Sequence, residues 1–182
     1  MENEKKPVSS KFLSLILRHR PEIVGLQLDQ QGWAFVEDLI SKVQKHGKQL
    51  DLEILREIVD SNNKKRFSFN KDATKIRANQ GHSVKVDLAY EPKVPPPILY
   101  HGTAGRNVSS ILNTGILKQI RHHVHLSESL PSAMEVGGRH GKPVVFEVLA
   151  GKMFEEGIDF FRSDNGVWLT DEVPVKFLKQ ID

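Results

Sequence analysis

Four short stretches of the sequence carry arginine and histidine side chains that could bind or transfer a phosphate group. In chain order they are LRHRP (17–21), RANQGHS (77–83), YHGT (100–103) and IRHHVHLS (120–127). Arginine suits phosphate because it stays charged and offers two parallel N–H donors, and histidine changes protonation near neutral pH. The motifs GxGxxG, GxxxxGKS/T and GxSxG are absent, and no obvious pair of acids suits Mg²⁺. If the protein handles phosphate, arginines rather than a metal ion are therefore expected to neutralise it.

The first stretch places Arg18 and His19 at the C-terminal end of a predicted helix, which Ser9 or Ser10 can cap and Pro21 stops. The partial negative charge at a helix C-terminus favours imidazolium, so His19 could serve as an acid near neutral pH. The alternative is a basic cluster that only satisfies the helix dipole.

The second stretch is expected to form a polar turn between two alternating runs, 73–76 and 84–88. A turn needs little more than glycine and perhaps an asparagine. This stretch holds more hydrogen-bond donors than a turn needs: Arg77, two amides, a histidine and a hydroxyl. The surplus suggests that it binds a ligand.

In the third stretch Gly102 follows an apolar strand and could let the backbone approach a ligand. His101 could donate to a ribose hydroxyl, and Thr103 could bond a ribose or an amide. The alternative is a strand end with an incidental histidine.

In the fourth stretch, strand alternation places Arg121, His123 and His125 on one face, with Ser127 continuing the row. Three basic side chains are poor core material because buried charge must be paired. A zinc site is the rival interpretation. We favour anion binding, because HExxH and cysteine ligands are absent.

The charge of the chain is unevenly spread. The net charge is +3, but residues 1–96 hold 17 Lys and Arg against 13 Asp and Glu, and residues 97–182 hold 9 against 10. The stretch 61–85 holds seven basic residues and one acid. This indicates a polyanionic partner, although a solvated lysine-rich face is the simpler alternative.

The composition, 38% apolar and 27% charged, is ordinary for a globular protein. Cysteine is absent, and neither a membrane-spanning run nor a signal-peptide pattern is found. We expect a cytoplasmic protein with no membrane association, and a monomer.

To present these side chains, the chain is expected to fold as two lobes. Four prolines in the stretch 92–97 stiffen the chain and block helix and inner strand. The expected division is a first lobe at 1–91, a linker at 92–97 and a second lobe at 98–182.

The first lobe is predicted to hold three helices, the second at 36–43 before Gly47 and the third capped by Asp51, and then a hairpin of 66–70 with 73–79. Helices followed by a basic hairpin resemble a winged helix. In the second lobe, strands are expected at 97–103, 122–127, 142–150, 165–170 and 173–181. Helices are expected at 106–116, ending at Gly115, and at 129–141, with Ser129 or Ser132 near its start.

Together and in this order, the four stretches resemble the RNA 2′-phosphotransferases, from about residue 10 to residue 177. The resemblance implies an α+β fold, with a winged-helix-like RNA-binding lobe joined to a β-rich lobe like that of the ADP-ribosyltransferases. It implies removal of an internal RNA 2′-phosphate at a tRNA-like splice junction, with NAD consumed as co-substrate and no metal.

The resemblance also implies roles for single residues. The catalytic set is Arg18, His19, Arg77 and Arg121. NAD or ADP-ribose would be bound by His101, Gly102, Thr103, His125 and Ser127, to which helix-end or loop placement adds Ser110, Gly115 and Asp164. RNA phosphates would be bound by Lys75, Gln80, Gly81, His82 and Ser83.

The implied reaction has two steps. The RNA 2′-phosphate first attacks the nicotinamide ribose, and the ribose 2″-hydroxyl then attacks phosphorus, giving 2′-OH RNA and ADP-ribose 1″,2″-cyclic phosphate. His19 could be the acid for the leaving RNA oxygen or the base for the 2″-hydroxyl. Two other functions stay open: a mono-ADP-ribosyltransferase with another acceptor, and a non-catalytic RNA- or ADP-ribose-binding module.

Overall fold

The computed structural model describes residues 7–181, apart from the side chain of His140. It has a mixed α+β architecture with several small antiparallel sheets, which confirms the expected class at this level. The chain divides into two compact units between Ala89 and Tyr90. Within the described residues, no helix is long and apolar enough to cross a bilayer.

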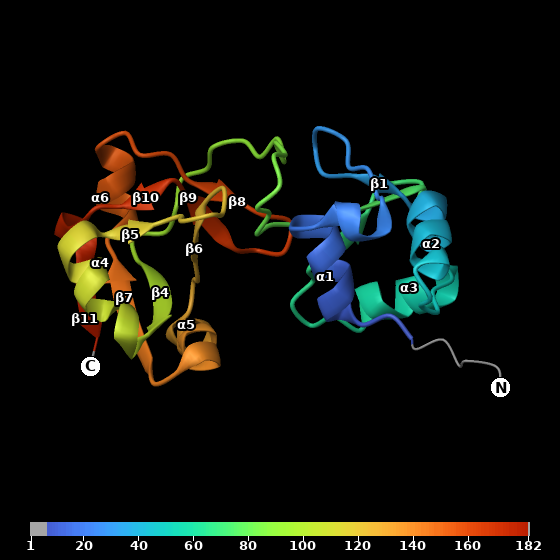
Figure 1. The fold of residues 1–182 in the computed structure, drawn as a ribbon. Helices are drawn as coiled ribbons and strands as arrows, with labels where there is room; N and C mark the ends of the chain where they lie inside the picture. Colours follow the sequence, from blue (N-terminus) through green and yellow to red (C-terminus); the bar gives the residue numbers. More distant parts are fainter. Residues whose placement is uncertain (1–6, 182) are drawn as a thin grey trace. The chain divides into compact units, whose positions relative to one another are not determined.

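The three predicted helices of the first unit are present, and the predicted caps at the start of the first and the third are confirmed (Figure 1). They are α1 (Ser10–Arg18), α2 (Val36–Lys45) and α3 (Leu52–Asp60). Ser9 caps α1 by accepting from the Phe12 N–H, and Asp51 caps α3 by accepting from the Ile54 N–H. A 3₁₀ turn at Pro21–Val24 follows α1, because proline cannot continue a helix but fits the first turn of a new one.

The sheet of the first unit has the antiparallel order β1-β3-β2. Its strands are β1 (Ala34–Phe35), β2 (Phe67–Phe69) and β3 (Lys75–Ala78). The predicted hairpin is confirmed, with Ser68 opposite Arg77. The core beneath the sheet is formed by apolar side chains of all three helices and the strands, among them Leu13, Ile16, Leu39, Leu55 and Ile76.

The run 84–88 is not a strand, contrary to the alternation of its residues. It bonds to a neighbouring loop and to the end of α1 instead: the Asp87 N–H donates to the Gln30 carbonyl, and the Val84 N–H donates to the Arg18 carbonyl. The stretch RANQGHS is therefore not a turn between two strands. Arg77 lies on β3, and the stretch from Asn79 to Ser83 is a loop.

The second unit holds eight strands among the residues that the structure describes. They are β4 (Leu99–Ala104), β5 (Ile116–Leu117), β6 (Val124–Leu126), β7 (Pro143–Val148), β8 (Phe161–Arg162), β9 (Trp168–Thr170), β10 (Glu172–Val173) and β11 (Leu178–Ile181). They form three small sheets with orders β11-β7-β4, β6-β9-β8 and β10-β5. A bridge between Tyr100 and Ser127 connects β4 to the chain just after β6.

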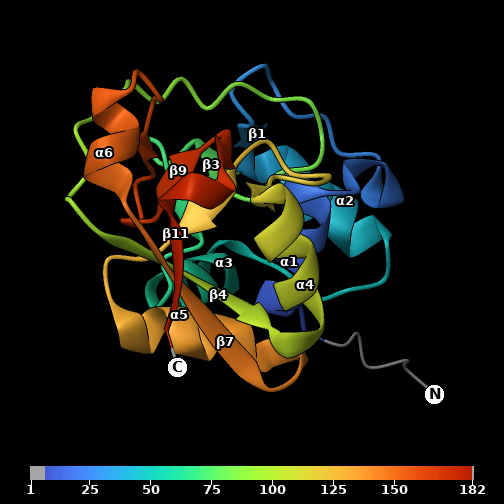
Figure 2. The same cartoon turned by 90° about the vertical axis from the view of Figure 1, so that its left-hand side faces the viewer.

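The helices of the second unit are α4 (Val108–Thr114), α5 (Leu130–Gly137) and α6 (Ala150–Glu155). The end of α4 at Gly115 and the cap of α5 by Ser129 are confirmed. Short 3₁₀ turns lie at Gly105–Asn107, Gly138–His140 and Val175–Phe177. Figure 2 shows β7 leading directly into α6, which the sequence pattern did not predict.

Three expected strands of the second unit are clearly shorter than their sequence pattern. The stretch 165–170 is a strand only over Trp168–Thr170. The stretch 122–127 pairs only over Val124–Leu126, and residues 119–123 form turns and bends. The stretch 173–181 is interrupted, because Pro174 has no N–H for a sheet and introduces the 3₁₀ turn at Val175–Phe177. The core of this unit includes Leu99, Leu126, Phe146, Phe160 and Val173.

Candidate functional site

In the first unit, the loop that carries Ser83 closes the C-terminal end of α1. The backbone N–H groups of Ser83 and Val84 donate to the carbonyl of Arg18, at 2.9 and 3.2 Å. The last carbonyl groups of a helix have no hydrogen-bond partners inside the helix. For Arg18, this loop supplies the missing N–H donors. Two stretches some 60 residues apart in the sequence, 17–21 and 77–83, are thus joined at one place.

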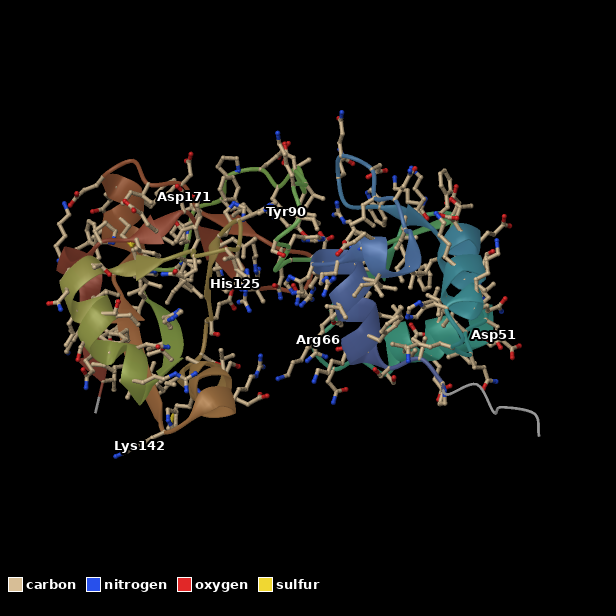
Figure 3. All side chains as sticks on the ribbon, viewed as in Figure 1. Asp51, Arg66, Tyr90, His125, Lys142 and Asp171 are labelled. Carbon is tan, nitrogen blue, oxygen red and sulfur yellow. The ribbon has the colours of Figure 1, made fainter. Side chains whose placement is uncertain are left out.

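The side chain of His19 lies at the same place. His19 is the residue that ends α1, and its Nδ1 lies 2.9 Å from the Ser83 hydroxyl oxygen. The Arg18 guanidinium donates to the carbonyl of Arg66 at 3.5 Å; Figure 3 shows Arg66 beside α1. An imidazole and a guanidinium at a helix C-terminus could bind a phosphate and exchange a proton with it.

Arg77 is held from two sides by groups of the same unit. The carbon of its guanidinium lies 4.5 Å from the centre of the Trp33 ring, and Nη1 lies 3.4 Å from the Leu88 carbonyl. The residue is 9% exposed. The sequence analysis did not single out Trp33. Ala34 on β1 is opposite Ile76 on β3, and extending this antiparallel register by one residue places Trp33 opposite Arg77.

The remaining loop residues have different surroundings. Gly81 has φ +85°, a left-handed conformation that glycine adopts without strain. Ser83 is exposed and Gln80 is half-buried, as is Lys75 on β3. His82 is only 1% exposed, and Gly32 packs close to its ring. A contact of His82 with RNA would need this packing to open, and it stays a prediction.

In the second unit, hydrogen bonds connect three of the expected residues. The Nδ1 of His101 lies 3.2 Å from the carbonyl oxygen of His125, and the Nη1 of Arg121 lies 3.1 Å from the Nδ1 of His125. Figure 3 shows His125 on β6, which faces β4. Arg121 lies in the turn before β6, so the turn rather than strand alternation brings it to His125, while His123 packs against the Phe161 ring.

These contacts fix the protonation of both rings. Burial lowers the pKa of His101, and the nearby charge of Arg121 lowers it further. The hydrogen bond to the His125 carbonyl raises this pKa but does not cancel the effect of burial. His101 is therefore neutral, with its proton on Nδ1, so Nε2 is a hydrogen-bond acceptor. An arginine always donates, so the neutral His125 ring accepts at Nδ1 and donates at Nε2. In this state Nε2 of His101 could accept from a hydroxyl group, and the expected contact of His101 with a ribose stays a prediction.

Gly102 and Gly115, the two glycines that the sequence singled out in the second unit, serve packing. A side-chain carbon at Gly102 would lie 1.6 Å from the Ala133 carbonyl oxygen, and one at Gly115 would lie 2.3 Å from the Val173 carbonyl oxygen. Gly102 therefore allows α5 to pack against β4, and this side of its backbone is not open to a ligand. Thr103 continues β4 and is buried, and its hydroxyl accepts from the Asn107 amide at 3.0 Å.

Two other expected side chains lie on the surface. Ser110 is exposed on α4 and Asp164 is exposed in the loop between β8 and β9. The backbone N–H of Asp164 donates to the Tyr90 hydroxyl at 3.2 Å. Of the expected nucleotide-binding residues, the structure connects His101, His125 and, through its backbone pair with Tyr100, Ser127.

Among residues 7–181, no group of three or more histidine and acidic side chains is placed to hold a metal ion. The arrangement offers cations and imidazoles instead. In each unit an arginine and a histidine lie together, which suits the binding of an anion and of hydroxyl groups.

The profile of a family described as "RNA 2'-phosphotransferase, Tpt1 / KptA family" matches residues 4–172 of the chain. The chain belongs to the RNA 2′-phosphotransferase family. It is similar to the probable RNA 2′-phosphotransferases of Trichormus variabilis, with 50% identity over all of both chains, and of Fusobacterium nucleatum, with 51% identity over 98% of this chain and 99% of the relative. A third relative of the same name, from Agrobacterium fabrum, is 54% identical over 93% of this chain and 91% of its own.

As a member of the RNA 2′-phosphotransferase family, the protein is an enzyme of the transferase class. The matched residues include all four stretches from which the sequence analysis began.

Proposed function

We propose that the protein removes an internal 2′-phosphate from RNA by transferring it to NAD⁺. The observation that supports this most directly is the contact of His19 with Ser83, which joins two distant stretches at one end of α1. A helix end that carries Arg18 and His19, with Arg77 on β3 packed against the same helix, is built to receive a phosphate.

In the first step, the RNA 2′-phosphate attacks the anomeric carbon of the nicotinamide ribose, and nicotinamide leaves. The phosphate is already an anion, because its second pKa is about 6, so this step needs alignment and no general base. The acceptor at His101 Nε2 and the donor at His125 Nε2 suit ribose hydroxyl groups, which both donate and accept. These two residues would orient the ribose.

In the second step, the ribose 2″-hydroxyl attacks phosphorus and the RNA 2′-hydroxyl leaves. Negative charge grows on the phosphoryl oxygens, where fixed guanidinium groups stabilise the transition state. Arg18, Arg77 and Arg121 would supply them. His19 would protonate the leaving RNA oxygen or, in the opposite assignment, accept the proton of the 2″-hydroxyl; either role is typically worth about 10²–10⁴-fold in rate.

The two parts of the chain would divide these tasks. The stretch 1–91, with three helices and a basic hairpin, would be a winged-helix-like RNA-binding lobe. The stretch 98–182 would be the NAD-binding lobe with an ADP-ribosyltransferase-like fold. The surplus of four positive charges in residues 1–96 supports this division, because RNA is a polyanion.

The test is to incubate the protein with a short RNA that carries one internal 2′-phosphate, with and without NAD⁺. We expect loss of the phosphate only with NAD⁺, and the same activity in the presence of EDTA. A stable ADP-ribosylated RNA as the end product would support a mono-ADP-ribosyltransferase instead. Binding without any turnover would leave a non-catalytic RNA-binding module.

A further inference from the structure

Two aromatic rings, each paired with a cation, lie along one face of the sheet in the first unit. Phe35 on β1 is opposite Lys75 on β3, and the lysine Nζ lies 4.8 Å from the centre of the ring. The pair of Trp33 and Arg77 lies one step further along the same strands, at 4.5 Å. Alternate residues of a strand share a face, so the two pairs form a row.

The two pairs differ in exposure. Arg77 is 9% exposed and is also bonded to the Leu88 carbonyl, so its pair is fixed within the unit. Phe35 is 60% exposed. One exposed apolar side chain needs no explanation by itself. Here, however, the exposed ring is the outer member of a row whose inner member is Arg77.

Asp29 contacts this row and is bonded on both of its carboxylate oxygens. Asp29 forms an ion pair with Lys75 at 3.1 Å, and its carboxylate accepts from the backbone N–H groups of Gln31 and Trp33. Asp29 therefore holds the turn that carries Trp33 and orients Lys75. Of this row, Phe35 and the part-exposed Lys75 reach the surface, while Arg77 is buried.

We propose that Phe35 and Lys75 form a subsite for the nucleotide next to the one that carries the 2′-phosphate. The base stacks on Phe35 and its phosphate pairs with Lys75. Residues two apart on a strand are separated by about 6.6 Å, the scale of one nucleotide step in an extended strand. An aromatic ring beside a cation is a common way to bind unpaired nucleotides.

This subsite rests on the proposed function, because it takes Arg77 as the group that meets the reacting phosphate. The subsite adds a requirement on the structure of the RNA substrate. The nucleotide beside the 2′-phosphate must be unpaired, so that its base is free to stack. RNA with the 2′-phosphate in a loop or a single strand is favoured over a continuous duplex.

The test measures the dissociation constant of a fluorescent 2′-phosphorylated RNA oligonucleotide by anisotropy, without NAD⁺. Phe35→Ala and Phe35→Leu are expected to weaken binding roughly 5- to 100-fold, the range for the loss of one base stack. Phe35→Tyr keeps an aromatic ring and is expected to bind like wild type. Leu52→Ala, at an apolar residue on α3 that is 39% exposed, is the matched control and should bind like wild type.

Two further readouts separate stacking from charge and from folding. With an oligonucleotide that lacks the bases beside the 2′-phosphate, wild type and Phe35→Ala should bind equally. Lys75→Gln should lower the slope of log Kd against log salt by about one, whereas Phe35→Ala should leave it unchanged. The proposal is overturned if Phe35→Ala binds like Leu52→Ala, or if its defect persists with the abasic RNA. Failure of the proposed function would show instead as no NAD-dependent turnover by the wild type, whatever the binding.

Discussion

At the scale of single residues, the hydrogen bonds of His101 and His125 give the two rings opposite roles. His101 donates its Nδ1 proton to the His125 carbonyl, and Arg121 donates to the His125 Nδ1. One ring therefore presents an acceptor and the other a donor. Arg121 has two functions in this account: it fixes the protonation of His125, and its charge is available to a phosphoryl oxygen.

Arg121→Ala is expected to slow the second step more than the first, because charge on the phosphoryl oxygens grows in the second. Loss of one such group costs roughly 10²–10³-fold in rate. ADP-ribosylated RNA should then accumulate, which electrophoresis of the RNA measures. Arg139→Ala, which removes a surface arginine 3.8 Å from Glu135 in the same unit, is the control and should leave no intermediate. If Arg121→Ala fails to consume RNA at all, this partition of roles is wrong.

The lowered pKa of His101 makes a prediction about stability. In the unfolded chain its pKa is about 6.5. As the pH falls through that value, the unfolded chain binds a proton that the folded chain does not, so the free energy of unfolding falls by at most about 1.4 kcal/mol per pH unit. His101→Gln should therefore lose less stability than wild type between pH 7.5 and pH 5.5.

Thermal unfolding at several pH values measures this difference. The other histidines contribute equally to both proteins, and the acidic side chains titrate at lower pH. Parallel curves of Tm against pH for the two proteins would show that burial does not hold His101 neutral.

At the scale of elements, the packing of α5 on β4 depends on two glycines. A side-chain carbon at position 102 would lie 1.6 Å from the carbonyl oxygen of Ala133, and one at Gly137 would lie 2.7 Å from the carbonyl oxygen of Thr103. The helix backbone and the strand backbone are therefore in direct contact. No flexible side chain is available to move aside.

Gly102→Ala is expected to destabilise the protein by about 1–3 kcal/mol, because α5 must shift away from β4. Gly138→Ala is the matched control. A side-chain carbon there would meet nothing within 4 Å and the backbone is helical, so the change should be neutral or stabilise by up to about 1 kcal/mol. Calorimetry measures both. Equal Tm values for the two variants would contradict the packing described for Gly102.

The sequence predicted those elements whose ends depend on residues close by in the chain. The caps of α1, α3 and α5 follow from Ser9, Asp51 and Ser129, whose side chains bond three residues along the chain. The alternation of residues 84–88 did not indicate a strand, because a loop can alternate in sequence while its backbone bonds to a helix end and to another loop. Local pattern does not contain those distant partners.

The candidate site was predictable to a similar extent. The arginine and histidine stretches could be found from residue types, and the family could be recognised from their order. The role of Gly102 in packing and the acceptor at His101 could not, because they depend on Ala133 and His125, which only the fold brings close. The same holds for Trp33 and Phe35, whose cations come from another strand.

At the scale of the whole molecule, charge is divided between the two parts of the chain in the way that the proposed tasks require. Residues 1–96 carry a net charge of +4 and residues 97–182 a net charge of −1. RNA binding should accordingly weaken as salt is raised, since each phosphate contact releases counterions.

The central claim is that the RNA 2′-phosphate passes to NAD⁺ and not to water. The most direct measurement uses RNA with a radiolabelled internal 2′-phosphate and follows the label by chromatography after incubation with the protein and NAD⁺. We expect the label in ADP-ribose cyclic phosphate, in an amount equal to the nicotinamide released. Label in inorganic phosphate, released equally well without NAD⁺, would contradict it.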